Sequence, residues 1–273
     1  MSTILLVDNG SRRANATQNL RRLAALLSER TGQTIHPVSL QHADKIPAEK
    51  LDGEPALTFE PFIRSCLENG DRDFIVLPLF FGPSRALSRF IPDHVETFKQ
   101  EFGDFNLWIA DVLCPLPQGE PRLTSILYDN ILHTAERAQL TADQVILVDH
   151  GSPIPEVTAV RKHLAEELTT HLNKEVSLTQ AVMERREGKE YDFNGKLLED
   201  ALRESAQRHA AQNVILAMLF LLPGRHAREG GDIDEIYTSV EQDFPGLRVM
   251  TTPLVGDHPD IIEILHSRLE DCL

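Results

Sequence analysis

The sequence predicts an α/β protein made of two similar parallel-sheet domains that derive from an internal duplication. Two repeats carry this prediction: residues 4–11 (ILLVDNGS) are echoed by residues 145–152 (VILVDHGS), and residues 74–86 are echoed by residues 214–226. The repeats keep nearly the same spacing, 150 − 9 = 141 positions in the first and 226 − 86 = 140 in the second. Each repeated segment begins with a continuous apolar run, which is typical of parallel strands covered on both faces.

Four strands are predicted in each half of the chain. They cover about residues 3–7, 34–40, 74–81 and 106–112 in the first half, and about residues 145–149, 175–182, 214–221 and 247–252 in the second. Longer amphipathic segments separate these strands. Strands and helices therefore alternate, as they do in parallel α/β domains.

Helices are predicted from apolar stripes at helical spacing and from start signals. The matching stripes of the two halves are Leu20, Leu23, Ala24 and Leu27, and Val157, Val160, Leu164, Leu168 and Leu172. A further helix is predicted to begin with a capping box of Asp232 and Glu235 and to run to about Phe244. The linker is predicted near residues 138–144, which divides the chain into domains 1–138 and 139–273.

The composition limits the class of protein. A net charge of −15 argues against non-specific binding to nucleic acid or to an anionic membrane. The three scattered cysteines form no CxxC motif and predict neither a disulfide framework nor a thiolate metal cluster. The apolar runs are shorter than the ~18–20 residues of a membrane span, and the N-terminal run, Ile4 to Val7, is too short for the core of a signal peptide. We therefore expect a cytoplasmic enzyme or binding protein.

Two histidines distinguish the second copy from the first. His150 and His226 stand where the first copy has Asn9 and Ala86. Each follows a predicted strand, and ligands of open parallel sheets bind beyond the carboxyl ends of the strands. We therefore predict that His150 and His226 face one cleft.

Other groups at the same strand ends can take part in chemistry. Glu184 follows the second strand of the second copy, at a position that corresponds roughly to Gln41, and its carboxylate can accept protons or bind a metal. The alternative is an exposed acid that pairs with Arg185 or Arg186. Arg225 and Arg228 flank His226 and can hold carboxylates through two hydrogen bonds each, although a solvated charged loop explains Arg228 equally well.

The loop that contains His150 also allows less specific interpretations. Gly151 permits a close backbone approach, and Ser152 can cap the next helix. A flavodoxin-like flavin or nucleotide binder would need a phosphate-binding loop, but the Walker and GxGxxG patterns are both absent. His258 precedes Pro259 and is predicted to be structural, as a cap of the last helix.

Three motifs together resemble the sirohydrochlorin chelatases of the CbiX type, which are class II chelatases. They are VDHGS at 148–152, PGRHAREGGDI at 223–233 and GDHP at 256–259. The resemblance covers essentially the whole chain, which is similar to the long form with two chelatase-like (flavodoxin-like) domains in one polypeptide. It implies a lyase that inserts Co²⁺ or Fe²⁺ into sirohydrochlorin without ATP, in cobalamin or siroheme biosynthesis.

The resemblance also implies roles for individual residues. His150 and His226 match the paired active-site histidines, and Glu184 matches an acidic position of related chelatases. The three would serve as catalytic groups and metal ligands, with Arg225, Arg228, Arg185 and Ser152 as substrate-binding residues. Asn9, Gln41 and Ala86 depart from the pattern, so the N-terminal site is expected to be degenerate.

The chemistry of metal insertion is compatible with these residues. Insertion removes two pyrrole protons while the metal loses water, and a neutral imidazole can bind a divalent metal or take a proton near pH 7. The expected partners are a divalent metal and sirohydrochlorin or a related tetrapyrrole. We expect no tightly bound cofactor; Co²⁺ or Fe²⁺ is the substrate. The choice among Co²⁺, Fe²⁺ and Ni²⁺ stays open, as does the oligomeric state, and the alternative function is a non-catalytic tetrapyrrole or metal carrier.

Overall fold

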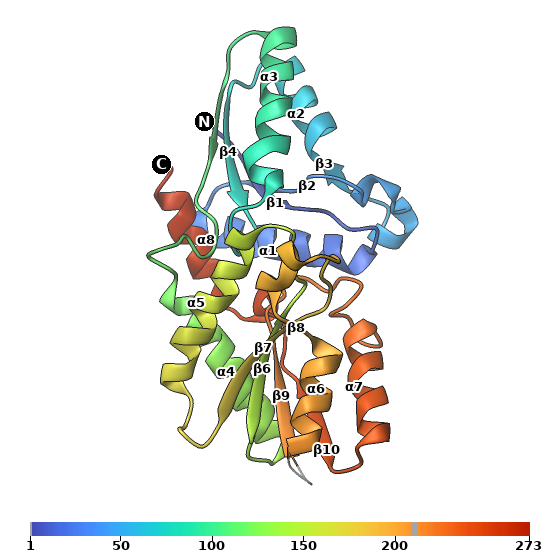
Figure 1. Ribbon diagram of the computed structural model, residues 1–273. Helices are drawn as coiled ribbons and strands as arrows, with labels where there is room; N and C mark the ends of the chain where they lie inside the picture. Colours follow the sequence, from blue (N-terminus) through green and yellow to red (C-terminus); the bar gives the residue numbers. More distant parts are fainter. Residues whose placement is uncertain (1, 209–211) are drawn as a thin grey trace. The chain divides into compact units, whose positions relative to one another are not determined.

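The computed structural model describes residues 2–208 and 212–273, which form two compact α/β units (Figure 1). Unit 1 comprises Met1–Pro115 and Pro259–Leu273, and unit 2 comprises Leu116–His258. Each unit contains a five-stranded sheet whose neighbouring strands pair in parallel. The predicted fold class is confirmed.

Unit 1 has the strand order β3-β2-β1-β4-β5. These strands are β1 (Thr3–Asp8), β2 (Ile35–Ser39), β3 (Leu57–Thr58), β4 (Asp73–Pro78) and β5 (Asn106–Ile109). Helices α1 (Ala14–Thr31) and α8 (Ile261–Glu270) pack together, with α1 against β2 and α8 against β4. Helices α2 (Phe59–Glu68) and α3 (Ile91–Phe102) enclose a second apolar core with the inner residues of β1, β2 and β4.

Unit 2 repeats this arrangement with the order β8-β7-β6-β9-β10. Its strands are β6 (Gln144–Asp149), β7 (Ser177–Val182), β8 (Lys196–Leu197), β9 (Gln212–Met218) and β10 (Leu247–Thr251). Figure 1 shows α4 (Pro121–Ala138) and α5 (Pro155–His171) on one face of the sheet, and α6 (Leu198–Arg208) and α7 (Asp232–Asp243) on the other. The core under α6 and α7 is apolar and contains the inner residues of β6, β7 and β9.

The central strands of the two sheets have equivalent registers. Val7 lies opposite Val38 on one side and Pro78 on the other, and Val148 lies opposite Ala181 and Met218 in the same way. The strand missed in each unit is the short edge strand, β3 or β8. Each has only two residues, too few to show a hydrophobic period.

The compact units do not divide where the linker was predicted. The boundary was placed at residues 138 and 139, whereas α4 belongs to unit 2 and α8 belongs to unit 1. Each repeat therefore contributes its last helix to the other unit: α4 packs on α5 and β9, and α8 packs on α1 and β4. The apolar face of a helix shows that it is buried, but it does not show which sheet it covers.

The predicted helices are found, with a correction at two N-termini. The stripe of α1 is buried, and in α5 Val160, Leu164 and Leu168 are buried. Helix α7 starts at Asp232, but its N-cap is Gly231 and no side chain caps it. The N-cap of α8 is Asp260, so His258 is not the cap; its Nε2 lies 3.9 Å from Oδ2 of Asp129.

Within residues 2–208 and 212–273, none of the helices has the length and apolar character that a membrane span requires.

Candidate active site

Three side chains of types that can bind a metal meet at the carboxyl edge of the unit 2 sheet. His150 directly follows β6, Glu184 lies two residues beyond β7, and His226 lies in the loop after β9. The strands β7, β6 and β9 are neighbours, so their loops lie together at one edge. Between β6 and β9 the chain changes winding direction, which is where open α/β sheets bind ligands.

The three side chains are close enough to share one ion. One ligand atom from each of His150, Glu184 and His226 lies within 4.8 Å of the others. The two imidazole rings are 4.7 Å apart between centroids, with an angle of 74° between their planes. Two imidazoles and a carboxylate form a donor set that suits divalent iron, cobalt and nickel alike.

His226 is the buried member of the group, with 5% of its surface exposed. Its Nε2 lies 3.4 Å from Oε1 of Glu184, and its Nδ1 lies 2.9 Å from Oδ2 of Asp232, a close approach without hydrogen-bond geometry. Burial and the neighbouring His150 lower the pKa of His226, against the opposing effect of the two carboxylates. The imidazole is therefore neutral, and able to bind a metal, over a wider pH range.

Asp232 was missed as a site residue because it had been interpreted as a helix cap. Its carboxylate contacts His226 and also lies 2.9 Å from Nε of Arg225. A negative charge 2.9 Å from Nδ1 favours the tautomer that carries its proton on Nδ1, which leaves the lone pair on Nε2 for a metal. The signal in the sequence was its position six residues after His226, beyond the turn at Gly230 and Gly231.

His150 is exposed, and its loop depends on a glycine. Its Nδ1 lies 3.3 Å from the carbonyl oxygen of Gly151. Gly151 has a φ of +88°, and a Cβ there would lie 2.0 Å from the carbonyl oxygen of Glu184. Gly10 repeats this close approach in unit 1, where the contact is the carbonyl oxygen of Gln41. Because Gly10 contacts Gln41 as Gly151 contacts Glu184, Gln41 is the structural counterpart of Glu184.

The predicted substrate-binding residues lie around this edge but have different partners. Arg225 lies 3.8 Å from Glu184, and Glu184 pairs with Arg225 and His226 rather than with Arg185 or Arg186 among the described residues. Arg185 donates to the carbonyl oxygen of Gly195, and Arg186 lies over the ring of Tyr191. Arg228 is exposed and contacts the carbonyl oxygen of Glu229 at 3.5 Å.

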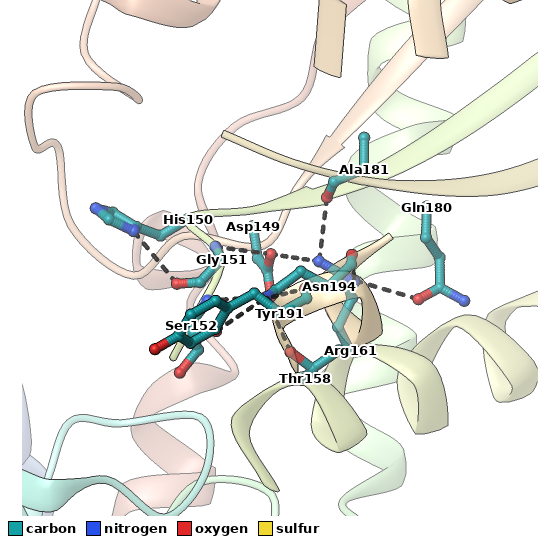
Figure 2. Close-up of polar contacts among 10 residues, drawn as sticks. All are labelled: Asp149, His150, Gly151, Ser152, Thr158, Arg161, Gln180, Ala181, Tyr191 and Asn194. Carbon is teal, nitrogen blue, oxygen red and sulfur yellow. Dashed lines mark hydrogen bonds and ion pairs between the residues drawn. The ribbon is translucent and has the colours of Figure 1, made fainter. Parts of the chain in front are cut away.

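Ser152 accepts a hydrogen bond from the backbone N–H of Ile154 at 3.0 Å. It therefore closes a turn before α5 and does not cap that helix, whose N-cap is Ile154. The N–H of Ser152 donates to Oδ1 of Asn194, part of a polar network shown in Figure 2. This network was not predicted from the sequence.

Unit 1 keeps a hollow at the corresponding edge without the metal-binding groups. A cavity of about 350 Å³ is lined by Asn9, Gln41, Ala86, Arg89 and Asp93, among others, and the carboxylate of Asp93 pairs with Arg89 at 3.7 Å. The positions that correspond to His150, Glu184 and His226 hold Asn9, Gln41 and Ala86. Amide and methyl side chains cannot replace imidazole and carboxylate as bases. The expected degeneracy of the first copy is consistent with this lining.

Beside this cavity, Asp8 is a buried carboxyl whose environment favours its neutral form. Burial raises the pKa of Asp8 to about 6, against hydrogen bonds from Ser39 and the N–H of Gly10. Because the pKa in the folded state exceeds that in the unfolded chain, Asp8 stabilises the fold below about pH 4 and loses this contribution as the pH rises through 6. Asp8→Asn should therefore raise the free energy of unfolding relative to the wild type at pH 8 but not at pH 4, by up to about 3 kcal/mol.

Urea unfolding of both proteins at the two pH values measures this difference. Asp104→Asn, which alters an exposed carboxylate of the same unit, is the control and should change neither value. A gain for Asp8→Asn that is equal at pH 4 and pH 8 would contradict the assignment to Asp8 ionisation.

Comparisons with known proteins give relatives of the same kind. The CbiX family model matches residues 3–132 and 144–272, which are the two repeats. Over 132 residues the chain is 26% identical to the chloroplastic sirohydrochlorin ferrochelatase of Arabidopsis thaliana, a match that covers 48% of this chain and 53% of that relative. The chain thus matches about half the length of this curated relative.

Solved structures share the fold over almost the whole chain. SirB from Bacillus subtilis with Fe³⁺ has a TM-score of 0.72 at 14% identity and covers 99% of this chain and 95% of its own. A cobalt complex of the sirohydrochlorin chelatase SirB from a Bacillus subtilis subspecies has a TM-score of 0.67 at 16% identity, with the same coverage. Since the family model matches both repeats, together nearly the whole chain, this protein belongs to the CbiX family.

Proposed function

We propose that this protein is a sirohydrochlorin chelatase, a lyase that inserts Co²⁺ or Fe²⁺ into the tetrapyrrole without ATP. The observation that carries the proposal is the group of His150, Glu184 and His226, whose ligand atoms lie within 4.8 Å of one another. Membership of the CbiX family and the activity named for the plant relative support it. The reaction would supply siroheme or cobalamin synthesis, and we propose a cytoplasmic location, although the plant relative is chloroplastic.

The chemistry has two requirements that this site can meet. The metal must exchange water for pyrrole nitrogens, and the two pyrrole N–H protons must leave, so that M²⁺ and the free macrocycle give the metal complex and two protons. Nε2 of neutral His226 and the imidazole of His150 can hold the metal or accept a proton. Glu184 has 52% of its side chain exposed and can pass protons to solvent.

The arginines at the same edge can hold the carboxylates of the substrate. Arg228 is exposed beside His226, and Arg185 has 40% of its side chain exposed. Arg225 forms ion pairs with Asp232 and Glu184, so it also helps to position the group of His150, Glu184 and His226. We therefore assign uniform substrate binding mainly to Arg228 and Arg185, with Ser152 in the adjacent loop.

Metal insertion under anaerobic conditions tests the proposal. Purified protein is mixed with an excess of sirohydrochlorin and either Co²⁺ or Fe²⁺ without ATP, and the visible spectrum of the macrocycle is followed. A chelatase converts many equivalents faster than the uncatalysed control. Conversion that stops at one equivalent per chain would indicate the alternative, a tetrapyrrole or metal carrier.

The pH dependence should follow the neutral form of His226. Because burial and His150 lower the pKa of His226, we expect kcat/KM to rise with pH and to reach half its maximum below the ordinary value of about 6.5. Asp232 opposes this shift, so Asp232→Asn should move the midpoint further toward acid. The profiles are measured from pH 5 to 8; a rate that is flat over this range while chemistry limits turnover would contradict a role for histidine.

Arg228→Ala should raise KM and leave kcat nearly unchanged. The substrate carboxylates are present in both the ground state and the transition state, so losing an arginine that holds them removes uniform binding. Exposed charge pairs are screened over about 8–10 Å at physiological ionic strength, so added salt should also raise the wild-type KM. Lys174→Ala is the matched control, because it removes one exposed positive charge from the loop before β7, at the opposite edge of the same sheet. A normal KM in Arg228→Ala together with a salt-independent wild type would remove Arg228 from substrate binding.

A further inference from the structure

Arg161 of α5 is a fully buried guanidinium within a polar network next to the candidate active site (Figure 2). It has 2% of its surface exposed, although it lies on the apolar face of its helix with Val160 and Leu164. A buried cation is costly unless its N–H groups are bonded, and those of Arg161 are. NH1 donates to Oδ1 of Asp149 at 2.6 Å, and NH2 donates to the carbonyl oxygen of Asn194 at 2.6 Å.

These bonds control the backbone on both sides of His150. On one side, Oδ1 of Asp149 accepts two hydrogen bonds. One comes from the guanidinium of Arg161 and the other from the N–H of Gly151, at 3.0 Å. On the other side, Asn194 accepts the N–H of Ser152 at 3.0 Å and donates to the carbonyl oxygen of Ser152 at 2.8 Å. The exposed imidazole is the side chain between these two anchored positions, and Figure 2 shows it turned away from the network.

The same guanidinium also reaches the strand that leads to Glu184. Nε donates to Oε1 of Gln180 at 3.2 Å, and NH1 is 3.3 Å from the carbonyl oxygen of Ala181, both on β7. Beyond β7, the N–H of Glu184 donates to the carbonyl oxygen of His150 at 3.0 Å. Arg161 therefore joins the ends of β6 and β7 and the segment that contains Asn194.

Unit 1 has the same fold without this cation. The offset of 141 that relates Asn9 to His150 relates Leu20 to Arg161, and Leu20 is fully buried in the core. Asp8, the counterpart of Asp149, has a buried Oδ1 without a hydrogen-bond partner. The sheet and helices of this unit thus form with a leucine in place of the arginine, in the copy that also lacks the histidine.

We propose that Arg161 is a positioning residue for the chelatase reaction, which fixes His150 by holding Asp149 directly and Ser152 through Asn194. The expected effect on turnover rests on the proposed function, whereas the fixed position of the His150 loop rests on the hydrogen bonds alone. An exposed metal ligand gains no orientation from packing around its own ring. The imidazole of His150 is restricted instead through its backbone, which is fixed on both sides. Groups that orient a metal ligand in this indirect way typically change metal affinity or activity by about 10–100-fold.

Two variants separate positioning from stability. Arg161→Leu alone leaves Asp149 as an unpaired buried carboxylate, which is strongly destabilising. Asp149→Asn/Arg161→Leu removes both charges and places an uncharged side chain beside a leucine, as in unit 1 when Asp8 is neutral, so we expect this double variant to fold. Asp8→Asn is the matched control, because it alters the corresponding carboxyl in unit 1.

Amide hydrogen exchange at Gly151 and Ser152 tests the proposal in the absence of substrate and metal. In the double variant both amides should exchange at least about tenfold faster than in the wild type, and kcat should fall at least about tenfold with KM nearly unchanged. Asp8→Asn should change neither quantity. A folded double variant with wild-type exchange at both amides and wild-type kcat would overturn the proposal.

Arg161→Lys gives a second test that keeps the charge. A single ammonium can pair with Asp149, but it cannot also reach the acceptors that the planar guanidinium joins. We expect this variant to fold and to show faster exchange at Ser152 and a reduced kcat; full protection and full activity would overturn the role of the guanidinium. If the wild type itself inserts no metal, the proposed function fails, while the exchange experiment still decides whether Arg161 holds the loop.

Discussion

His226→Ala and His150→Ala should each reduce kcat by about 10²–10⁴-fold, the usual contribution of a general acid or base. The two imidazole rings are 4.7 Å apart between centroids and, together with Glu184, could hold one ion, so we expect that neither can substitute for the other. For His226 the loss should be larger, because its buried ring also lies against Glu184 and Asp232, and its removal leaves both carboxylates without the imidazole. Initial rates of metal insertion at saturating sirohydrochlorin measure the effect.

Asn9→Ala is the matched control for the histidine variants. Asn9 holds the position of His150 in unit 1, where the cavity lining lacks a metal-binding pair. We expect a change of less than about twofold in kcat, since its amide is neither a base nor a strong metal ligand. If Asn9→Ala damaged turnover as much as His150→Ala, the assignment of the chemistry to unit 2 would be wrong.

Glu184→Gln should reduce kcat by about 10²-fold and weaken metal binding as well. Glutamine keeps the shape and one oxygen donor, but it cannot accept a proton at neutral pH. The carboxylate is also the group 3.4 Å from Nε2 of His226, and its charge raises the pKa of that imidazole. Its loss should therefore move the rising limb of the pH profile toward acid while lowering the plateau.

Two controls identify the source of this effect. Gln41→Ala changes the structural counterpart of Glu184 and should have little effect on kcat. Glu187→Gln removes an exposed acid three residues further along the same segment, and it tests whether the loss of any nearby negative charge has the same effect. A Glu184→Gln enzyme with wild-type kcat at every pH would exclude this carboxylate from proton transfer.

The repeated apolar strands made the fold predictable, because a buried parallel strand leaves a continuous hydrophobic run. The same pattern placed His150, Glu184 and His226 beyond the ends of strands and predicted that the two histidines face one cleft, but it left open whether Glu184 faces that cleft too. Their roles remain predictions that the variants above test. The two-residue edge strands and the assignment of α4 and α8 to their units depend on tertiary packing, which leaves no local signal.

Polar groups around the histidines were harder to predict. Asp232 satisfied the sequence pattern of a helix cap, yet its carboxylate turns to His226 and Arg225. Arg161 gave a signal that could have been used, since it is a charge on the apolar stripe of α5 between Val160 and Leu164. Asn194 gave none, because its partners come from the loop after β6 and from α5, about 40 residues earlier in the chain.

Binding of Co²⁺ in the absence of tetrapyrrole tests the central claim most directly. Anaerobic titration followed by the visible absorption of Co²⁺ should show one ion per chain with the spectrum of imidazole and carboxylate coordination. His150→Ala and His226→Ala should each weaken this binding at least about tenfold, while Asn9→Ala should leave it unchanged. Identical Co²⁺ affinity and spectrum in the wild type and in the His150→Ala/His226→Ala double variant would contradict a metal site formed by His150, Glu184 and His226.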